Sequence, residues 1–187
     1  MKRIVIFASG SGTNAENIIK YFQKSTVATV VQVLSNKKDA KVLIRANRLN
    51  VKNLHFDKDI FFNTDTILKL IEKEADFIIL AGFLLRIPQK IIKAFPNRIV
   101  NIHPALLPKY GGKGMYGMHV HNAVIENKEE KTGITIHYVN ENYDEGAIIF
   151  QKNVSIDKDD TAEIVAKKIH QLEMNYFPKV IENLLNS

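Results

Sequence analysis

The chain has 187 residues, 45% of them hydrophobic and 25% charged, which is the composition of a globular protein with one domain. It lacks cysteine, which excludes disulfides, thiolate metal sites and a cysteine nucleophile. The absence of cysteine suits the reducing cytoplasm, where we expect the protein to act. The net charge of +6 favours an anionic partner, but the scattered lysines and the short apolar runs point to neither nucleic acid nor a membrane.

The first half of the chain alternates short apolar runs with helical patterns. Strands are predicted at 3–8, 27–34, 51–55, 76–81 and up to 103, and helices at about 14–22, 40–49, 64–74 and 89–95. The apolar, β-branched strands are of the kind that is buried on both faces of a parallel sheet. We therefore predict an α/β fold, with residues 1–187 forming a single Rossmann-like domain whose helices cover both faces of the sheet.

The pattern changes after Pro108. A glycine-rich loop at 109–117 is a candidate lid, with a plain connector as the alternative. A helix is expected at 118–127, followed by strands at 134–139 and 147–150, whose hairpin-like spacing makes the sheet mixed. Asp160 and Glu163 form a capping-box pattern at the start of the last helix, which Pro178 should kink or restart.

Three polar segments follow predicted strands, at 9–14, 82–87 and 101–108. Ligands of parallel sheets bind beyond the carboxyl ends of the strands, so we expect these segments to converge. The first reads Ser-Gly-Ser-Gly-Thr-Asn and opens a helix, a place that favours phosphate. It lacks the third glycine of a dinucleotide fingerprint and the Gly-Lys-Ser/Thr of a P-loop, so a tight turn without a ligand remains the alternative.

Asn101 and His103 are the strongest candidates for chemistry. Residues two apart on a strand share a face, which brings an amide donor beside a proton carrier that titrates near neutral pH. Such a pair can stabilise an oxyanion and move a proton; the alternative is a strand end with two polar residues. Asp144, in the polar turn 140–146, could orient a histidine or be an ordinary turn aspartate.

The other histidines carry weaker signals. His55 ends a strand and His137 lies within an alternating strand, and both are interpreted as structural. His119 and His121 could be combined with His103 as a metal site, but residues i and i+2 of a helix do not face each other. We therefore predict no metal site.

These segments together resemble the phosphoribosylglycinamide formyltransferase family, the folate-dependent transformylases of purine biosynthesis. The resemblance rests on Asn-Ile-His-Pro-Ala-Leu-Leu-Pro at 101–108, Ser-Gly-Ser-Gly-Thr-Asn at 9–14 and Leu-Ala-Gly-Phe at 80–83. It extends from Ile4 to about Ile181. The Asn-x-His-Pro-x-x-Leu-Pro signature with a later aspartate is specific to folate formyl-transfer domains, but it does not decide the acceptor.

The resemblance implies a formyltransferase fold and transfer of a formyl group from 10-formyltetrahydrofolate, a co-substrate, to the amine of glycinamide ribonucleotide, without a tightly bound cofactor. The implied catalytic residues are Asn101, His103 and Asp144, with protonated His103 and Asn101 donating to the oxyanion. The implied glycinamide ribonucleotide residues are Gly12, Thr13, Asn14, His170 and Glu173. The implied folate residues are Leu84, Leu85, Arg86, Ile87, Asn101, Asn140, Glu141, Asn142, Tyr143 and Asp144.

The chain also departs from the family. Where many relatives have Ser-Arg-Glu after Phe-Asp, it has Lys58-Asp59, so an arginine contact to folate is in doubt at Asp59. The loop from Gly111 to Gly117 is longer than in many members, which leaves lid closure and contacts to the folate tail open.

Related functions remain as alternatives. Methionyl-tRNA formyltransferase carries an added C-terminal domain, for which we expect no room in 187 residues. The hydrolase of formyltetrahydrofolate usually has an added N-terminal domain, whereas the first strand here begins at Arg3. A hydrolase-like enzyme and a non-catalytic module that binds a phosphosugar or nucleic acid stay open. The protein is expected to be a monomer or a homodimer that acts on small molecules.

Overall fold

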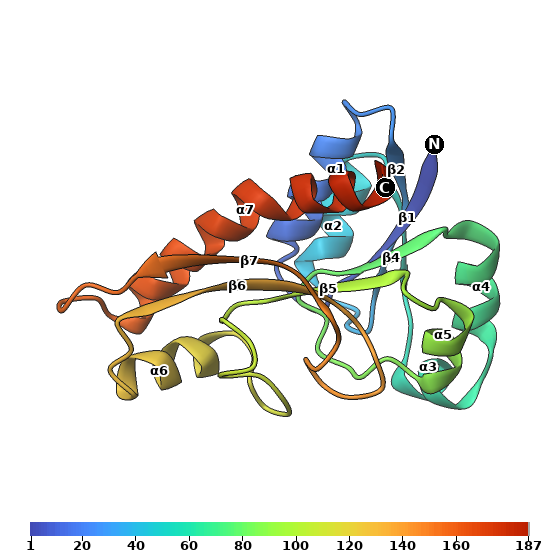
Figure 1. Cartoon of the computed structure of the whole chain (residues 1–187). Coiled ribbons are helices and arrows are strands. Elements are labelled where there is room, and N and C mark those ends of the chain that lie inside the picture. Colours follow the sequence, from blue (N-terminus) through green and yellow to red (C-terminus); the bar gives the residue numbers. More distant parts are fainter. Residues whose placement is uncertain (187) are drawn as a thin grey trace. The chain divides into compact units, whose positions relative to one another are not determined.

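Strands and helices alternate through most of the chain in a computed structural model that describes residues 1–186 (Figure 1). The strands are β1 (Lys2–Phe7), β2 (Ala28–Ser35), β3 (Lys52–His55), β4 (Phe77–Leu80), β5 (Ile99–His103), β6 (Lys131–Tyr138) and β7 (Ile148–Ser155). The helices are α1 (Thr13–Phe22), α2 (Lys41–Arg48), α3 (Lys58–Asn63), α4 (Thr66–Glu74), α5 (Gln89–Ala94), α6 (Met118–Glu126) and α7 (Ala162–Asn186). The hydrogen-bonded strand order is β3-β2-β1-β4-β5-β6-β7, with parallel pairing of β1 to β2 and β4 and antiparallel pairing of β6 to β7. The predicted α/β class with a mostly parallel mixed sheet is thus confirmed.

The contacts of the chain group into two compact units, and each is described by itself. The first consists of Met1–Val100 together with the chain from Pro178 onward, and the second is Asn101–Phe177. The chain passes from one unit to the other within β5 and within α7. That residues 1–187 form a single domain stays a prediction.

The first unit is built on four parallel strands, of which β1, β2 and β4 are largely buried and the edge strand β3 is partly exposed. The side chains from Ile4 to Phe7 in β1, and Ile78 and Ile79 in β4, are fully buried, as the unbroken apolar runs predict. Figure 1 shows α1 and α2 on one face of these strands and α3, α4 and α5 on the other. This arrangement follows from right-handed crossovers, because the chain first moves outward to β3 and then returns to β4.

The second unit contains the end of β5, α6, the β6–β7 pair and most of α7. Residues of β6 and β7 pair from Lys131 with Ser155 to His137 with Ile148, and the register shifts between Ile136 and His137. Such a bulge bends a strand and redirects its side chains, and it is common beside active sites. His137 therefore leaves the regular ladder at the end of β6 that faces the polar turn 140–146.

Several sequence-based boundaries differ from the structure. The strands β6 and β7 are longer than predicted because most of their added residues are polar or exposed, which removes the apolar signal. The short helix α3, which contains Asp59, was not predicted. Asp160 does not cap α7: its carboxylate accepts the Asp157 N–H, and Thr161 Oγ1 accepts the Ile164 N–H instead. The helix α7 continues through Pro178 rather than restarting there.

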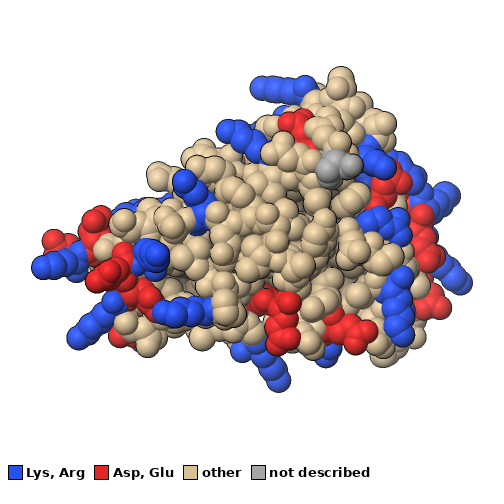
Figure 2. All heavy atoms as spheres, in the orientation of Figure 1, with Lys and Arg blue, Asp and Glu red and all other residues tan. Residues whose placement is uncertain are grey.

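Side chains of both charges are exposed on the face that Figure 2 draws. Figure 2 shows Lys and Arg side chains interspersed with Asp and Glu side chains on the face in view. Within residues 1–186, none of the helices has both the length and the apolar character needed to cross a membrane.

Candidate active site

Asn101 and His103 lead from β5 to one common carboxylate. His103 Nδ1 lies 3.5 Å from Asp144 Oδ2. The Asn101 amide nitrogen donates to His137 Nε2 at 3.1 Å, and the same His137 nitrogen lies 3.6 Å from Asp144 Oδ1. The alternation of strand side chains therefore predicted correctly that Asn101 and His103 face the same group of residues.

The turn that follows β5 is fixed by Thr135 in the middle of β6. The Thr135 hydroxyl donates to the Ala105 carbonyl at 2.7 Å and accepts the Leu107 N–H at 3.0 Å. Gln151 of β7 donates both to this hydroxyl and to the Leu107 carbonyl. Because Thr135 is fully buried, these bonds are shielded from water and hold the chain just beyond His103 in one position.

Asp144 sits in a left-handed backbone conformation, with φ 56°. Aspartate tolerates this region better than most residues, which allows the turn to aim the carboxylate inward. Burial by itself would raise the pKa of Asp144, but His137 and His103, when protonated, and the Gly112 N–H, which donates to Oδ2 at 3.0 Å, together lower it. The carboxylate is therefore ionised at neutral pH.

His103 is buried, with 3% of its surface exposed. Its Nε2 contacts the Tyr110 carbonyl at 2.7 Å, and a carbonyl can only accept, so Nε2 carries a hydrogen. Burial lowers the pKa of His103, although Asp144 and the Tyr110 carbonyl oppose this shift. At rest the ring is thus neutral rather than protonated, and its Nδ1 lone pair faces Asp144.

His137 also belongs to this cluster, although its place in an alternating strand had predicted a structural role only. It is buried, with 2% of its surface exposed, and its Nδ1 donates to the Tyr138 carbonyl at 2.8 Å. Nε2 is then free to accept the hydrogen of the Asn101 amide. The alternating pattern of β6 signalled that His137 is buried but carried no information about its partners.

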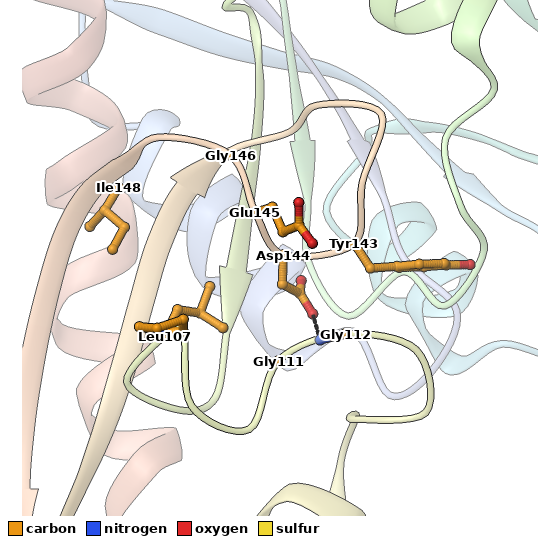
Figure 3. A pocket seen from close by; sticks show the side chains of 9 residues that line it. Leu107, Gly111, Gly112, Tyr143, Asp144, Glu145, Gly146 and Ile148 are labelled. Carbon is orange, nitrogen blue, oxygen red and sulfur yellow. Dashed lines mark hydrogen bonds between the residues drawn. The ribbon is translucent and has the colours of Figure 1, made fainter.

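A cavity of about 360 Å³ opens beside Asp144 (Figure 3). Figure 3 shows the Asp144 carboxylate pointing at the Gly112 nitrogen, with Tyr143 extending away from Leu107 and Ile148. The cavity is lined by Leu107, Pro108, Gly111, Gly112, Tyr143, Asp144, Glu145, Gly146 and Ile148. The lining combines apolar side chains with a partly buried carboxylate, Asp144, and an exposed one, Glu145. A few polar groups among apolar walls are typical of a pocket for a small organic molecule.

The helices α6 and α7 add polar groups to the same unit. His121, on the buried face of α6, is close enough to His103 and Glu173 for their charges to affect its pKa, which burial lowers. Its Nδ1 is buried and has no hydrogen-bond partner within residues 1–186. Glu173 pairs with His170 at 3.5 Å and raises its pKa, so the predicted common face of these two residues is confirmed. The exposed His119 instead packs its ring edge against Tyr116.

The predicted phosphate turn belongs to the first unit. Gly12 precedes α1 in the left-handed region, with φ 77°, and a Cβ there would lie 2.5 Å from Val42. No side chain caps α1 at this position, so its first N–H groups, at Thr13 and Asn14, face the turn. The Arg45 guanidinium donates to the Ser11 carbonyl at 2.9 Å and is also paired with the Glu16 carboxylate of α1.

The predicted folate segments lie in different units. Residues 84–87 follow β4 in the first unit, where the Leu84 N–H donates to Ser9 Oγ and the Phe83 ring packs 5.3 Å from Phe7. The turn 140–144 belongs to the second unit, where Asn142 bonds to Asn140 and Glu145. In each unit the segment is anchored by polar contacts and leaves apolar side chains exposed, among them Leu84 and Tyr143.

The arrangement in the second unit can support acyl or formyl transfer. It supplies an amide donor on Asn101, a neutral imidazole on His103 and an ionised carboxylate on Asp144 that can stabilise a positive charge on the ring. Within residues 1–186, no three His, Asp or Glu side chains are grouped to hold a metal ion.

Comparisons with known proteins agree with this chemistry. The model of a family described as Formyl transferase matches residues 2–181. A chloroplastic phosphoribosylglycinamide formyltransferase of Arabidopsis thaliana is 38% identical over 96% of this chain, which spans only 64% of that relative. A second plant relative, from Vigna unguiculata, is matched over 61% of its length. The phosphoribosylglycinamide formyltransferase of Bacillus subtilis is 35% identical over 99% of this chain and 95% of its own length.

Solved structures give the same result. Glycinamide ribonucleotide transformylase 1 from Symbiobacterium toebii superposes with a TM-score of 0.90 and 32% identity, over 100% of this chain and 88% of that one. Phosphoribosylglycinamide formyltransferase from Bacillus halodurans superposes with a TM-score of 0.87 and 37% identity, over 98% of this chain and 95% of that one.

Proposed function

The chain belongs to the formyl transferase family, and from this premise we propose that it transfers the formyl group of 10-formyltetrahydrofolate to the amine of glycinamide ribonucleotide. The acceptor is proposed because the similar proteins are named for it. The observation that supports the proposal most strongly is the convergence of Asn101, His103 and Asp144 on one buried cluster.

The proposed reaction begins with attack of the amine nitrogen on the formyl carbon. A carbon–nitrogen bond forms and the formyl oxygen becomes an oxyanion; collapse then breaks the bond to the folate nitrogen, which takes up the proton that the amine loses. The Asn101 amide donates to the oxyanion, and loss of one such donor typically lowers the rate by about 10²–10³. Orientation of the two substrates supplies much of the remaining acceleration.

His103 is proposed to carry the proton between the two nitrogens. Because the resting ring is neutral, it can accept the proton that the amine releases, and the ionised Asp144 carboxylate beside Nδ1 stabilises the resulting charge. The proton then moves to the folate nitrogen, and His103 returns to its neutral form.

Substrate binding is assigned to the remaining predicted residues. We propose that the turn at Gly12, Thr13 and Asn14 binds the phosphate, since the N-terminus of α1 faces it. The pair of His170 and Glu173 is proposed to hold the rest of the ribonucleotide. Folate is proposed to bind along residues 84–87 and 140–144, together with Asn101. No metal, tightly bound cofactor or nucleic acid enters the proposal, and the protein is proposed to act in the cytoplasm as a monomer or homodimer.

The test mixes the protein with 10-formyltetrahydrofolate in the presence and absence of glycinamide ribonucleotide and follows the folate product by absorbance. Turnover that requires the ribonucleotide supports the proposal. Turnover without it indicates a hydrolase, and the absence of turnover together with binding of the ribonucleotide indicates a binding module.

Three substitutions connect the activity to the cluster. Asn101→Ala, His103→Ala and Asp144→Ala should each lower kcat by about 10²-fold or more while the circular dichroism spectrum is preserved. Asn153→Ala, at an exposed position of β7, is the matched control and should retain full activity. Near-normal turnover in all three cluster variants would reject the assignment of these residues.

A further inference from the structure

One short loop segment contacts both side chains that the proposed mechanism uses for proton transfer. The Tyr110 carbonyl accepts the Nε2 hydrogen of His103 at 2.7 Å, and the Gly112 N–H donates to Asp144 Oδ2 at 3.0 Å (Figure 3). These are main-chain groups only two residues apart. The position of the segment from Tyr110 to Gly112 therefore sets the orientation of His103 and Asp144 together.

The contact with Tyr110 also decides which nitrogen of His103 exchanges its proton. With Nε2–H held by a carbonyl, the free lone pair is on Nδ1, which is the nitrogen 3.5 Å from Asp144. A proton taken up by His103 then arrives next to the carboxylate that stabilises it. If the segment moved away, the ring could adopt the other tautomer and lose this arrangement.

The main chain of the segment does not hold this position by its own preference. Tyr110 has φ 57°, a left-handed conformation that is an outlier for a bulky residue. Gly111 brings the main chain close to the site: a Cβ there would lie 2.5 Å from Leu107 Cδ2, which would have to shift, and 3.4 Å from the Asp144 Cβ. Several glycines follow in 112–117, and they add freedom rather than rigidity.

The side chain of Tyr110 supplies the anchor. Its hydroxyl donates to Glu129 Oε1 at 2.9 Å, and Lys109 Nζ pairs with the same oxygen at 2.9 Å. Glu129 follows α6, and its N–H donates to the Val124 carbonyl, which fixes its backbone to the helix. The hydrogen bonds from Lys109 and Tyr110 lower the pKa of Glu129, so its carboxylate stays charged and the bond to the tyrosine hydroxyl is charge-assisted.

We propose that Glu129 is a positioning residue for the reaction, which through the Tyr110 hydroxyl holds the segment from Tyr110 to Gly112 against His103 and Asp144. Glu129 touches neither proposed reacting atom and acts through the loop. The inference rests on the proposed function of the cluster. It adds a connection from the end of α6 to the proton-transfer pair.

The test compares Glu129→Met and Tyr110→Phe, each of which removes the anchoring bond and nearly preserves the size of the side chain. Each should lower kcat by about threefold to tenfold, the effect of a charge-assisted hydrogen bond that sets the population of the anchored loop, while KM for both substrates stays near the normal value. The double variant should be no slower than the slower single variant, because both substitutions remove the same contact. Glu130→Met, at the exposed neighbouring position, is the control and should leave kcat unchanged.

A spectroscopic measurement separates positioning from general stability. Nitrogen NMR of the histidine rings should detect one tautomer of His103, with the hydrogen on Nε2, in the normal protein, and a mixture in Glu129→Met and Tyr110→Phe. Unchanged kcat and an unchanged tautomer in both variants would overturn the inference, as would effects that add in the double variant. If the normal protein is inactive with both substrates, the proposed function fails, and the NMR result still decides whether Glu129 controls His103.

Discussion

His137 gives the sharpest prediction about how the site is held together. Its Nε2 supports the Asn101 amide at 3.1 Å, and its Nδ1 hydrogen is bound by the Tyr138 carbonyl at 2.8 Å. The two roles can be separated, because the amide of Asn can replace Nδ1 and the longer Gln can replace Nε2. His137→Asn should keep the bond to Tyr138 and lose the one to Asn101, and His137→Gln should do the reverse.

The magnitudes follow from the groups left without partners. Each variant abandons one partly buried polar group, which costs about 1–3 kcal/mol of unfolding free energy, so chemical denaturation should find the two variants similarly destabilised. Their rates should differ: His137→Asn releases Asn101, and misplacing such a donor by about 1 Å costs about 10²-fold in kcat. His137→Gln should lose less than about tenfold.

A double-mutant cycle tests whether His137 acts through Asn101. In a background of Asn101→Ala, His137→Asn should lower kcat by less than about threefold more, since the group that it supports is already gone. Steady-state kinetics with saturating substrates provide the measurement. Equal rates for the Asn and Gln variants, or a full additional loss in the double variant, would refute the reasoning.

Three further predictions concern glycine positions and pH. Gly12→Ala forces a Cβ against Val42 at a positive φ and should cost about 1–3 kcal/mol of unfolding free energy. The same variant should bind the ribonucleotide more weakly when binding is measured by calorimetry. Gly10→Ala, with open space around its Cβ, is the control and should change neither stability nor binding. Gly133→Ala would press a Cβ into a carbonyl oxygen of β7 and should destabilise the protein by about 3 kcal/mol or more; a melting temperature near the normal value would contradict this. Because burial lowers the pKa of His121 when the chain folds, the unfolded chain binds more protons, and stability is lost as the pH falls below the ordinary value of 6.5 toward the lowered one. His121→Asn should therefore flatten the fall in melting temperature between about pH 7 and pH 5, and an unchanged slope would show that this histidine does not contribute.

Much of the fold could be predicted because its signals are local. The buried strands β1 and β4 are continuous apolar runs, and the turn at Gly12 carries the glycine that its positive φ requires. The strand β7 was predicted too short because residues such as Lys152 are exposed and polar, so its pairing with β6 rather than its own pattern makes it a strand. The cap of α7 at Thr161 was missed because Asp160 offers an equally good sequence signal and is used elsewhere.

The site was predictable only in part, for a physical reason. Asn101 and His103 share a strand, so the period of two places them together. Asp144 lies far along the chain, and its proximity depends on the pairing of β6 with β7 and on the turn between them. The contact of His103 with the Tyr110 carbonyl involves a main-chain atom, which no residue type encodes, and His137 looks like any buried strand residue until its partners are known.

The left-handed backbone conformation at Asp144 also limits which residues can replace this aspartate. Position 144 needs a carboxylate for its charge and a residue that accepts φ 56°, and of the acidic residues only aspartate is enriched in that region. Glu145 borders the same cavity but cannot exchange roles with its neighbour by a simple swap, because a glutamate at 144 would have the charge without the backbone tolerance. Asparagine would have the tolerance without the charge. A substitution at position 144 must therefore meet two independent requirements, the negative charge and the positive φ. We expect a functional replacement to need changes in the neighbouring residues of the turn as well as at position 144.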